Sequence, residues 1–395
     1  MQTDKAFVEV DFGQHSKSGQ QAAGDVFLSK KIPEEGRTIC VLADGLGSGI
    51  KAHVLATLTA TMAMKYISSD IDIRRASEII MATLPICSER KIGYSTFTIV
   101  DIRSDGRVSV IEYDNPPFRL LRDGVLVDID KKKLEVATAN RGRCEVLYSS
   151  FTARQGDRTV FYTDGVTQSG MGRDATPFGW GNDAVGSYIV EQCGMERDIS
   201  ARQLSRSVVE KARRIDGGKA KDDISCAVVN FRRPRKSVVM TGPPLDERKD
   251  TEMARILREY GGRKIVCGGT TARIIARELG EEISVDLGCL DSSVPPASNI
   301  AGVDLVTEGT LTLSRMAEIL EAGEDPDKLK SNAAVRLARY LLDSDIIEFV
   351  VGTKINEAHQ DPNFPVELDI RRNLMKRIVG LLNTKYLKQA NMRLI

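Results

Sequence analysis

The spacing of apolar residues changes several times along the chain, and each change predicts a different kind of element. Spacings of three and four residues predict helices in the first part of the chain, at 48–69, 72–86, 182–193 and 199–215. Apolar residues that alternate with polar ones around short turns predict hairpins at 94–114, 118–130 and 144–165, and a strand at 222–231. Hairpins with long helices inserted between them predict an α+β domain with antiparallel sheets.

A basic stretch that contains prolines, residues 232–250, separates this pattern from a different one and predicts a domain boundary. Beyond it, strands and helices alternate, with a strand, small-residue turn and helix at 262–279, a strand at 345–353 and a helix at 365–387. That order is typical of an α/β domain. We therefore expect a first domain at residues 1–235 and a smaller α/β domain, regulatory in role, at residues 245–395.

Composition and charge narrow the class of protein. The 395 residues carry a formal net charge of +1, so no basic field favours nucleic acid or a membrane surface as a partner. No apolar run approaches the roughly 20 residues that span a bilayer, and the first residues lack a secretory signal pattern. Seven cysteines occur without a Cys-x-x-Cys pair: Cys40, Cys87, Cys144, Cys193, Cys226, Cys267 and Cys289. Scattered cysteines predict buried free thiols, and hence a cytoplasmic protein.

Aspartates stand where predicted strands of the first domain meet loops. Asp44 follows the apolar run at 39–43 and precedes Gly-Leu-Gly-Ser-Gly. This arrangement suits either a phosphate cradle of backbone N–H groups or a metal ligand on a rigid strand end. Asp164 also ends a predicted strand and precedes a glycine. Three more aspartates open predicted strands, namely Asp25, Asp222 and Asp223.

These aspartates allow two interpretations. Each one alone is readily explained as a turn residue. Several carboxylates that converge, however, repel one another unless a cation neutralises them. The histidines His15, His53 and His359 lack the spacing of metal ligands, so the donors are oxygens, which suit Mg²⁺ or Mn²⁺ better than zinc. The residues alone support a carboxylate metal site and leave its chemistry open.

Six short motifs add a family resemblance that covers roughly residues 1–232. In chain order they are AAGDVF, LADGLGSG, EYDNPPFRL, VFYTDGVTQSG, FG at 178–179, and KDDISCAVV. The ordered set resembles the metal-dependent serine/threonine phosphatases of the type 2C superfamily, and more narrowly their bacterial SpoIIE branch. One departure is Asp114-Asn115, which stands where many relatives carry a glycine–histidine pair. We interpret that segment as structural or substrate-facing.

The resemblance implies an αββα sandwich with two Mn²⁺ or Mg²⁺ ions at one edge. It implies that the metal-binding residues are Asp25, Asp44, Gly45, Asp164, Asp222 and Asp223. Asp44 would bridge the ions, the carbonyl of Gly45 would ligate one of them, and Asp25 would act mostly through water. Asp164 and Asp222 would complete the other shell, so Asp44, Asp164 and Asp222 would be the catalytic set. Asp223 would support them.

The implied activity is hydrolysis of phosphoserine or phosphothreonine on a regulatory protein by a water that two metal ions activate. This mechanism needs no protein nucleophile, so we expect Cys40 in the core. Arg37 is the one candidate we find for the phosphate-binding arginine of the eukaryotic enzymes. Two alternatives remain open: a non-catalytic sensor on the same fold, and a phosphate- or nucleotide-binding function in the second domain. No GxGxxG or Walker pattern follows a strand, which weighs against nucleotide binding.

The second domain contains one candidate anion site. In KIVCGGTTARIIAREL, a predicted strand leads into Gly268, Gly269, Thr270 and Thr271, and a helix follows. Free N–H groups of the first helical turn and the two hydroxyls would then face one point. Ordinary capping of the helix by threonine explains the same residues. A small anionic regulator and a second copy of the chain are therefore candidate partners, beside the phosphorylated protein substrate.

Overall fold

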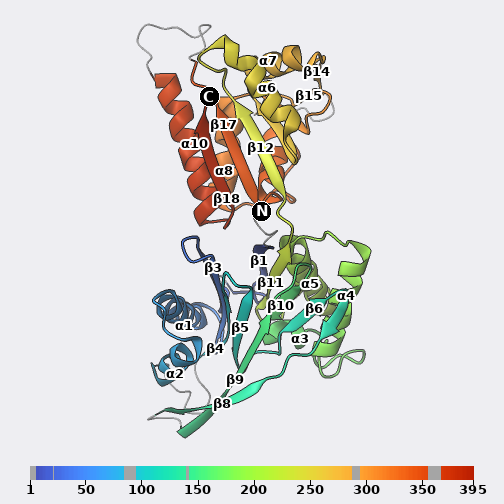
Figure 1. Cartoon of the computed structure of the whole chain (residues 1–395). Helices are drawn as coiled ribbons and strands as arrows, with labels where there is room; N and C mark the ends of the chain where they lie inside the picture. Colours follow the sequence, from blue (N-terminus) through green and yellow to red (C-terminus); the bar gives the residue numbers. More distant parts are fainter. Residues whose placement is uncertain (1–5, 21, 84–94, 139–141, 287–293, 355–365) are drawn as a thin grey trace. The chain divides into compact units, whose positions relative to one another are not determined.

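The computed structural model describes residues 6–20, 22–83, 95–138, 142–286, 294–354 and 366–395 (Figure 1). The chain divides into two compact units, Met1–Arg233 and Pro234–Ile395. Cys87 and Cys289, two of the cysteines that we predict to be free thiols, lie outside the described residues, as does His359. Each unit has its own sheets and its own apolar clusters, so each is described by itself.

The first unit contains two antiparallel sheets. The five-stranded sheet has the order β1 (Phe7–His15), β11 (Ile224–Arg232), β10 (Arg158–Tyr162), β6 (Arg119–Arg122) and β7 (Val125–Val127). The six-stranded sheet has the order β2 (Asp25–Ile32), β3 (Arg37–Gly45), β4 (Ser95–Ile102), β5 (Arg107–Tyr113), β9 (Gly142–Thr152) and β8 (Lys132–Thr138). Every pairing in these two sheets is antiparallel, as the hairpin pattern predicts.

Side chains of β3 show why the two sheets are layered with helices on both outer faces. Ile39, Val41 and Ala43 pack against the helices α1 (Ile50–Ser68) and α2 (Ile73–Thr83). Cys40 and Leu42, on the opposite face of the strand, pack between the sheets. A third cluster joins the outer face of the other sheet to α4 (Asn182–Met195) and α5 (Ala201–Ile215). The layers are therefore α, β, β and α, which confirms the predicted sandwich (Figure 1).

One predicted hairpin of the first unit is wrong. Strand β9 pairs with β5 and β8, whereas β10 pairs with β6 and β11 in the facing sheet. The turn between them therefore carries the chain across the sandwich, and Asp157 fixes it by accepting hydrogen bonds from the Arg154 N–H at 2.7 Å and Arg122 Nε at 2.9 Å. Alternation of apolar residues shows that a strand has a buried face, but it does not say which sheet supplies the partner.

The second unit is built on one mainly parallel sheet of seven strands. Its order is β14 (Ser284–Val285), β15 (Ser298–Asn299), β16 (Leu305–Thr307), β13 (Arg263–Cys267), β12 (Lys236–Thr241), β17 (Ile346–Val351) and β18 (Gln389–Leu394). The strands from β16 to β18 are parallel, whereas β14 and β15 pair antiparallel at one edge. The chain thus starts in the middle at β12, winds outward through β13 to β16, and returns to the other side of β12 at β17.

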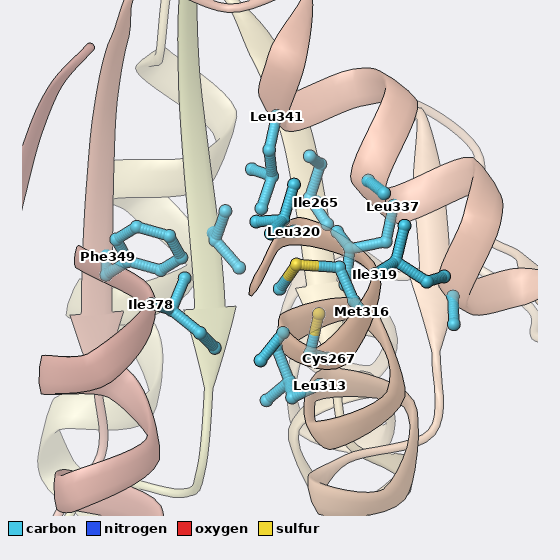
Figure 2. Close-up of a cluster of buried hydrophobic side chains, with 14 of the residues drawn as sticks. Ile265, Cys267, Leu313, Met316, Ile319, Leu320, Leu337, Leu341, Phe349 and Ile378 are labelled. Carbon is cyan, nitrogen blue, oxygen red and sulfur yellow. The ribbon is translucent and has the colours of Figure 1, made fainter. Parts of the chain in front are cut away.

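Helices cover both faces of this sheet. On one face Val238 and Met240 of β12 pack with α6 (Asp250–Glu259) and α7 (Gly269–Leu279). On the other face Val239 packs with α8 (Thr310–Ala322), α9 (Ala333–Leu342) and α10 (Val366–Thr384). Figure 2 shows this second cluster, in which Phe349 of β17 and Ile378 of α10 belong to one buried group. The second unit is therefore an α/β layered structure.

The two units meet between Arg233 and Pro234, within the stretch 232–250 that we predict as a domain boundary, but strand β12 places the start of the second unit before residue 245. Residues 236–241 form an interior strand of the second sheet, between β13 and β17, and Val238, Val239 and Met240 have no exposed surface. The prolines and basic residues on either side of this short apolar run gave the stretch a polar composition, which concealed the strand. None of the described helices is long and apolar enough to cross a membrane.

Candidate metal centre

The predicted aspartates lie where the space between the two sheets ends. Asp25 and Asp44 are directly opposite each other in the β2–β3 pair. Both continue the inward face of their strands, because Phe27 and Leu42, two residues away, belong to the cluster between the sheets. Side chains two apart along a strand share a face. The two carboxylates are therefore a polar end to an otherwise apolar interior.

The other sheet brings its polar side chains to the same end. In β10 and β11 the inward residues Phe161 and Ala227 belong to the cluster between the sheets. By the same alternation, Thr163 and Ser225 also face inward beyond that core. Thr163 Oγ1 donates a 2.9 Å hydrogen bond to Asp25 Oδ2, so the two sheets are joined at this point. Asp25 has only 3% of its surface exposed.

Asp164 and Asp222 complete the group from the ends of β10 and β11. Asp164 is the first residue of the short helix α3 (Asp164–Thr167), and its Oδ2 accepts a hydrogen bond from Gln168 Nε2 at 2.8 Å. Asp222 is half-buried and precedes β11. The structure therefore brings Asp25, Asp44, Asp164 and Asp222 to one end of the sandwich, on strands of both sheets.

Asp223 has a different position from the other four aspartates. It is buried, and both of its carboxylate oxygens accept backbone hydrogen bonds: Oδ1 from the Lys17 N–H at 2.9 Å and Oδ2 from the Gly24 N–H at 2.7 Å. These bonds fasten the loop that leads into Asp25. Asp223 thus positions the chain next to the carboxylate group through these two hydrogen bonds.

The glycines after Asp44 and Asp164 are required by close backbone packing. A side chain at Gly45 would overlap the carbonyl oxygen of Ala52 in α1, and one at Gly165 would overlap the carbonyl oxygen of Asp223. Neither glycine has a positive φ angle, so contact rather than conformation selects them. The repeated Asp-Gly pair therefore marks two strand ends that other segments approach very closely.

Burial is the largest cause that raises the pKa values of Asp25, Asp44, Asp164 and Asp222, and neighbouring negative charges add to its effect. Burial and, after it, the charges of Asp164 and Asp222 raise the pKa of Asp44 to about 8. Burial, followed by the charge of Asp44, raises the pKa of Asp25 well above its usual value. Burial also raises the pKa values of Asp164 and Asp222. We call these four residues the carboxylate cluster.

The carboxylate cluster offers only carboxylate oxygens as donors. Among the described residues, no three Asp, Glu, His or Cys side chains are gathered closely enough to hold an ion as they stand. The raised pKa values nevertheless show that the four groups act on one another. Carboxylates without a cation between them are expected to move apart or share a proton. The donor set, which is entirely oxygen, fits a hard divalent cation.

Two residues near the cluster were not predicted as site residues from the sequence. Asp114 has a φ angle of 57°, in the region that favours glycine, and its charge helps to raise the pKa of Asp164. Its neighbour Asn115 has a structural position, because it bonds Thr96 Oγ1 at 2.6 Å and Thr98 Oγ1 at 3.1 Å on β4. Lys17 lies beside Asp222, with 3.8 Å between Nζ and Oδ1. What identifies Asp114 and Lys17 as neighbours of the site is that each lies close in space, and not in sequence, to an aspartate at a strand end.

Arg37 does not fit the role of a phosphate-binding residue. It opens β3, whereas Asp44 lies at the far end of that nine-residue strand. Its guanidinium group is buried and bonds Asp101 Oδ1 at 2.7 Å and Oδ2 at 3.0 Å. It also pairs with Asp70 Oδ1 at 2.8 Å. Arg37 is committed to structural ion pairs, which is a correction to the sequence-based candidate.

Cysteine and histidine side chains are absent from the carboxylate cluster as far as the described residues show. Cys40 is buried in the core as expected, and burial raises the pKa of its thiol to about 12. The described cysteines Cys40, Cys144, Cys193, Cys226 and Cys267 are free thiols. His53 Nδ1 lies 2.8 Å from the backbone oxygen of Ala23, which gives that histidine a structural contact.

In the second unit, the residues predicted as an anion site lie at the start of α7. Gly268 precedes the helix and Gly269 begins it, without a side-chain cap at the first turn. Thr271 is buried, whereas Thr270 is half-buried. A methyl group at Gly269 would lie 3.3 Å from a carboxylate oxygen of Glu308, the residue that follows β16. The negatively charged Glu308 side chain therefore lies beside the start of α7, where the anion site is predicted.

Comparisons with known proteins identify a family for the first unit. Residues 34–232 match the family model of Stage II sporulation protein E (SpoIIE). A structure of the PP2C phosphatase domain and a fragment of the regulatory domain of SpoIIE from Bacillus subtilis is similar at 19% identity and a TM-score of 0.48, over 57% of this chain and 64% of that one. The chain thus spans less than two thirds of that structure.

Two further structures show comparable similarity. The RsbU and RsbW domains of Rv1364c from Mycobacterium tuberculosis match at 17% identity and a TM-score of 0.46, over 64% of this chain and 68% of that one. RsbX in complex with magnesium matches at 18% identity and a TM-score of 0.40, over 57% and 95%. A search of curated protein sequences gives no match. The family model covers half of the 395 residues, and on that match the chain belongs to the SpoIIE family of PP2C-type phosphatases.

Proposed function

We propose that the protein hydrolyses phosphoserine or phosphothreonine on a regulatory protein, with two Mg²⁺ or Mn²⁺ ions at the carboxylate cluster. The observation that carries this proposal is the convergence of Asp25, Asp44, Asp164 and Asp222 from both sheets on one end of the sandwich. Their raised pKa values mean that the group is costly to ionise without a cation. The match to a phosphatase family supports the reaction class.

The residues of the chain have separate tasks in this proposal. Asp44, Asp164 and Asp222 would hold the ions through carboxylate oxygens, with the carbonyl of Gly45 as a further oxygen donor. Asp25, which is buried and bonded by Thr163, would hold a water molecule in place. Asp223 would keep the adjoining loop fixed through its two backbone hydrogen bonds. When bound, divalent ions lower the pKa of water and neutralise phosphoryl oxygens.

The central test combines metal binding with turnover. We expect calorimetric titration of Mn²⁺ into the wild-type protein to show binding, and phosphate release from phosphoserine and phosphothreonine peptides to require Mn²⁺ or Mg²⁺. Asp44→Asn should lose both, whereas the control Asp105→Asn, in the exposed β4–β5 turn, should retain both. Full turnover after chelation would exclude the metal-dependent mechanism. Metal binding without turnover on any phosphopeptide would favour the non-catalytic sensor instead.

The second unit is proposed to regulate the first by binding a small anionic ligand. The topology supports this proposal, because β12 and β17 are neighbours from which the chain winds in opposite directions. In open parallel sheets, ligands bind beyond the carboxyl ends of strands at such a point. Glycines follow β12, β13 and β17 at those ends, at positions 242, 268 and 352. The start of α7 supplies free backbone N–H groups nearby.

The free cysteines agree with a reducing compartment. We therefore propose a cytoplasmic location, where disulfides are rare.

A further inference from the structure

Lys17 carries a positive charge at the edge of the carboxylate cluster. It lies in the loop between β1 and β2, and its Nζ is 3.8 Å from Asp222 Oδ1. About one third of its side chain is exposed, and Asp222 is also partly exposed, so the pair borders on solvent. Lys17 is thus an internal cation of the proposed metal centre.

Hydrogen bonds hold the backbone around Lys17 in place. Its N–H donates to Asp223 Oδ1 at 2.9 Å, and the N–H of Ser18 donates to the Ala220 oxygen at 3.0 Å. The Lys17 carbonyl accepts a 3.1 Å bond from the Gln20 N–H, which closes a turn. A fixed Cα with a flexible stem of four carbons lets the ammonium group sweep a small volume around Asp222.

The charge balance of the proposed metal centre suggests a second role for the Lys17 ammonium group, which is to bind phosphate. The carboxylate cluster and Asp223 together outweigh the charge of two divalent ions. The metal-loaded centre is therefore negative before a phosphate dianion arrives, and a further cation within reach would stabilise the bound phosphate. Arg37 is committed to Asp101 and Asp70 at the other end of β3. Lys221 donates to the backbone oxygen of Met171 at 2.7 Å.

We propose that Lys17 is an exchangeable counter-cation, which pairs with Asp222 in the metal-free protein and turns to the phosphoryl oxygens of the substrate when Asp222 binds a divalent ion. This inference rests on the proposed phosphatase function. Lys17 then has two opposite effects: it competes with the ion for Asp222, and it attracts the phosphate. A residue with a merely structural role would not change the two affinities in opposite directions.

The test measures both affinities on the full-length protein with Lys17→Met and Lys17→Gln. Calorimetry gives the affinity for Mn²⁺, and a second titration gives the affinity of the Mn²⁺-loaded protein for inorganic phosphate. We expect Mn²⁺ to bind roughly threefold to tenfold more tightly to either variant, and phosphate about tenfold more weakly, which corresponds to about 1.4 kcal/mol. Lys17→Arg should restore phosphate binding. Lys30→Met, an exposed lysine on β2, is the matched control and should change neither affinity.

Turnover separates this inference from the function on which it rests. With a phosphopeptide substrate, Lys17→Met should raise KM about tenfold while kcat changes less. Unchanged phosphate affinity in both variants would overturn the role of Lys17, even if the wild type is an active phosphatase. A wild type that binds Mn²⁺ and phosphate but releases no phosphate from any phosphopeptide would overturn the proposed function, and the two binding titrations would still decide the role of Lys17. Circular dichroism of each variant identifies a folding defect, and Lys17→Gln replaces Lys17→Met if the latter is unfolded.

Discussion

Strand ends followed by glycine occur in both units, but they have different surroundings. In the first unit, Gly45 and Gly165 follow aspartates whose pKa values are raised by burial and by neighbouring acids. In the second unit, Gly268 follows the thiol Cys267, whose pKa is raised by burial to about 12. The buried acid Asp250 of that unit is paired with Arg277 at 2.6 Å. A glycine turn therefore marks close packing in both units, and only the converging acids of the first unit indicate a cation site.

The largest expected effect is the loss of Asp44. Replacing Asp44 by Asn should reduce kcat with a phosphopeptide by ~10³-fold or more, because a carboxylate that would hold the ions is lost. Asp223→Asn should cost less, since its oxygens accept backbone N–H groups and an amide retains one acceptor. Steady-state kinetics at saturating Mn²⁺ measure both. Equal, mild losses would show that the ligands are assigned to the wrong residues.

The next effect concerns stability at the same strand end. Gly45→Ala should destabilise the first unit by ~1–3 kcal/mol, because the new methyl group would overlap the Ala52 carbonyl. Gly380→Ala in α10 is the matched control, since nothing lies within 4 Å of that position. The control should gain ~0.5–1 kcal/mol from reduced chain entropy. Urea unfolding measures both changes, and a neutral Gly45→Ala would contradict the close packing.

A pH series should distinguish the carboxylate cluster from the partnered acids of the second unit. The folded-state pKa of Asp44 is raised from 3.8 to about 8, so its protonated form is favoured by folding. Its contribution to stability is complete below about pH 4 and is lost as the pH rises through 8. The pKa values of Asp25, Asp164 and Asp222 are also raised, so their contributions to stability change with pH in the same direction.

The melting temperature of metal-free protein should therefore fall between pH 5 and pH 9. Saturating Mn²⁺ should reduce that fall, and Asp44→Asn without metal should be more stable than wild type at pH 9. Differential scanning fluorimetry in chelator measures these changes. A metal-free protein that becomes more stable towards pH 9 would contradict the shifted carboxyl groups.

The smallest expected effect belongs to the second unit. If a simple anion binds at the start of α7, the neighbouring carboxylate of Glu308 opposes it. Glu308→Gln should then strengthen phosphate binding by up to ~1 kcal/mol, the scale of an exposed charge pair. Thr270→Ala should weaken phosphate binding, and Glu324→Gln, at an exposed position after α8, is the control that should leave it unchanged. Thermal shift of the full chain with phosphate and nucleotides measures the effect, and no shift with any of them would remove the anion proposal.

Local patterns predicted most elements of the first unit but could not assign every strand to its sheet. The helices α1, α2, α4 and α5 follow the predicted spacing closely. The step from β9 to β10 was predicted as a hairpin because a short turn joins two alternating runs. In the second unit, β12 was hidden by polar neighbours, and its place between β13 and β17 inside the sheet explains the burial of residues 237–241.

The sequence by itself determined the chemical nature of the site. Asp44 and Asp164 stand at strand ends before glycines, and oxygen is the donor that the motifs offer. Only the tertiary structure decided which acids face the space between the sheets. It also shows that both carboxylate oxygens of Asp223 accept backbone N–H groups. Arg37 forms an ion pair with Asp101 and is therefore not a phosphate-binding residue. The tertiary structure also placed Lys17 beside Asp222, more than 200 residues away in the chain. The physical reason is that residue type fixes what a group can bind, whereas its charge partners depend on which strands pair.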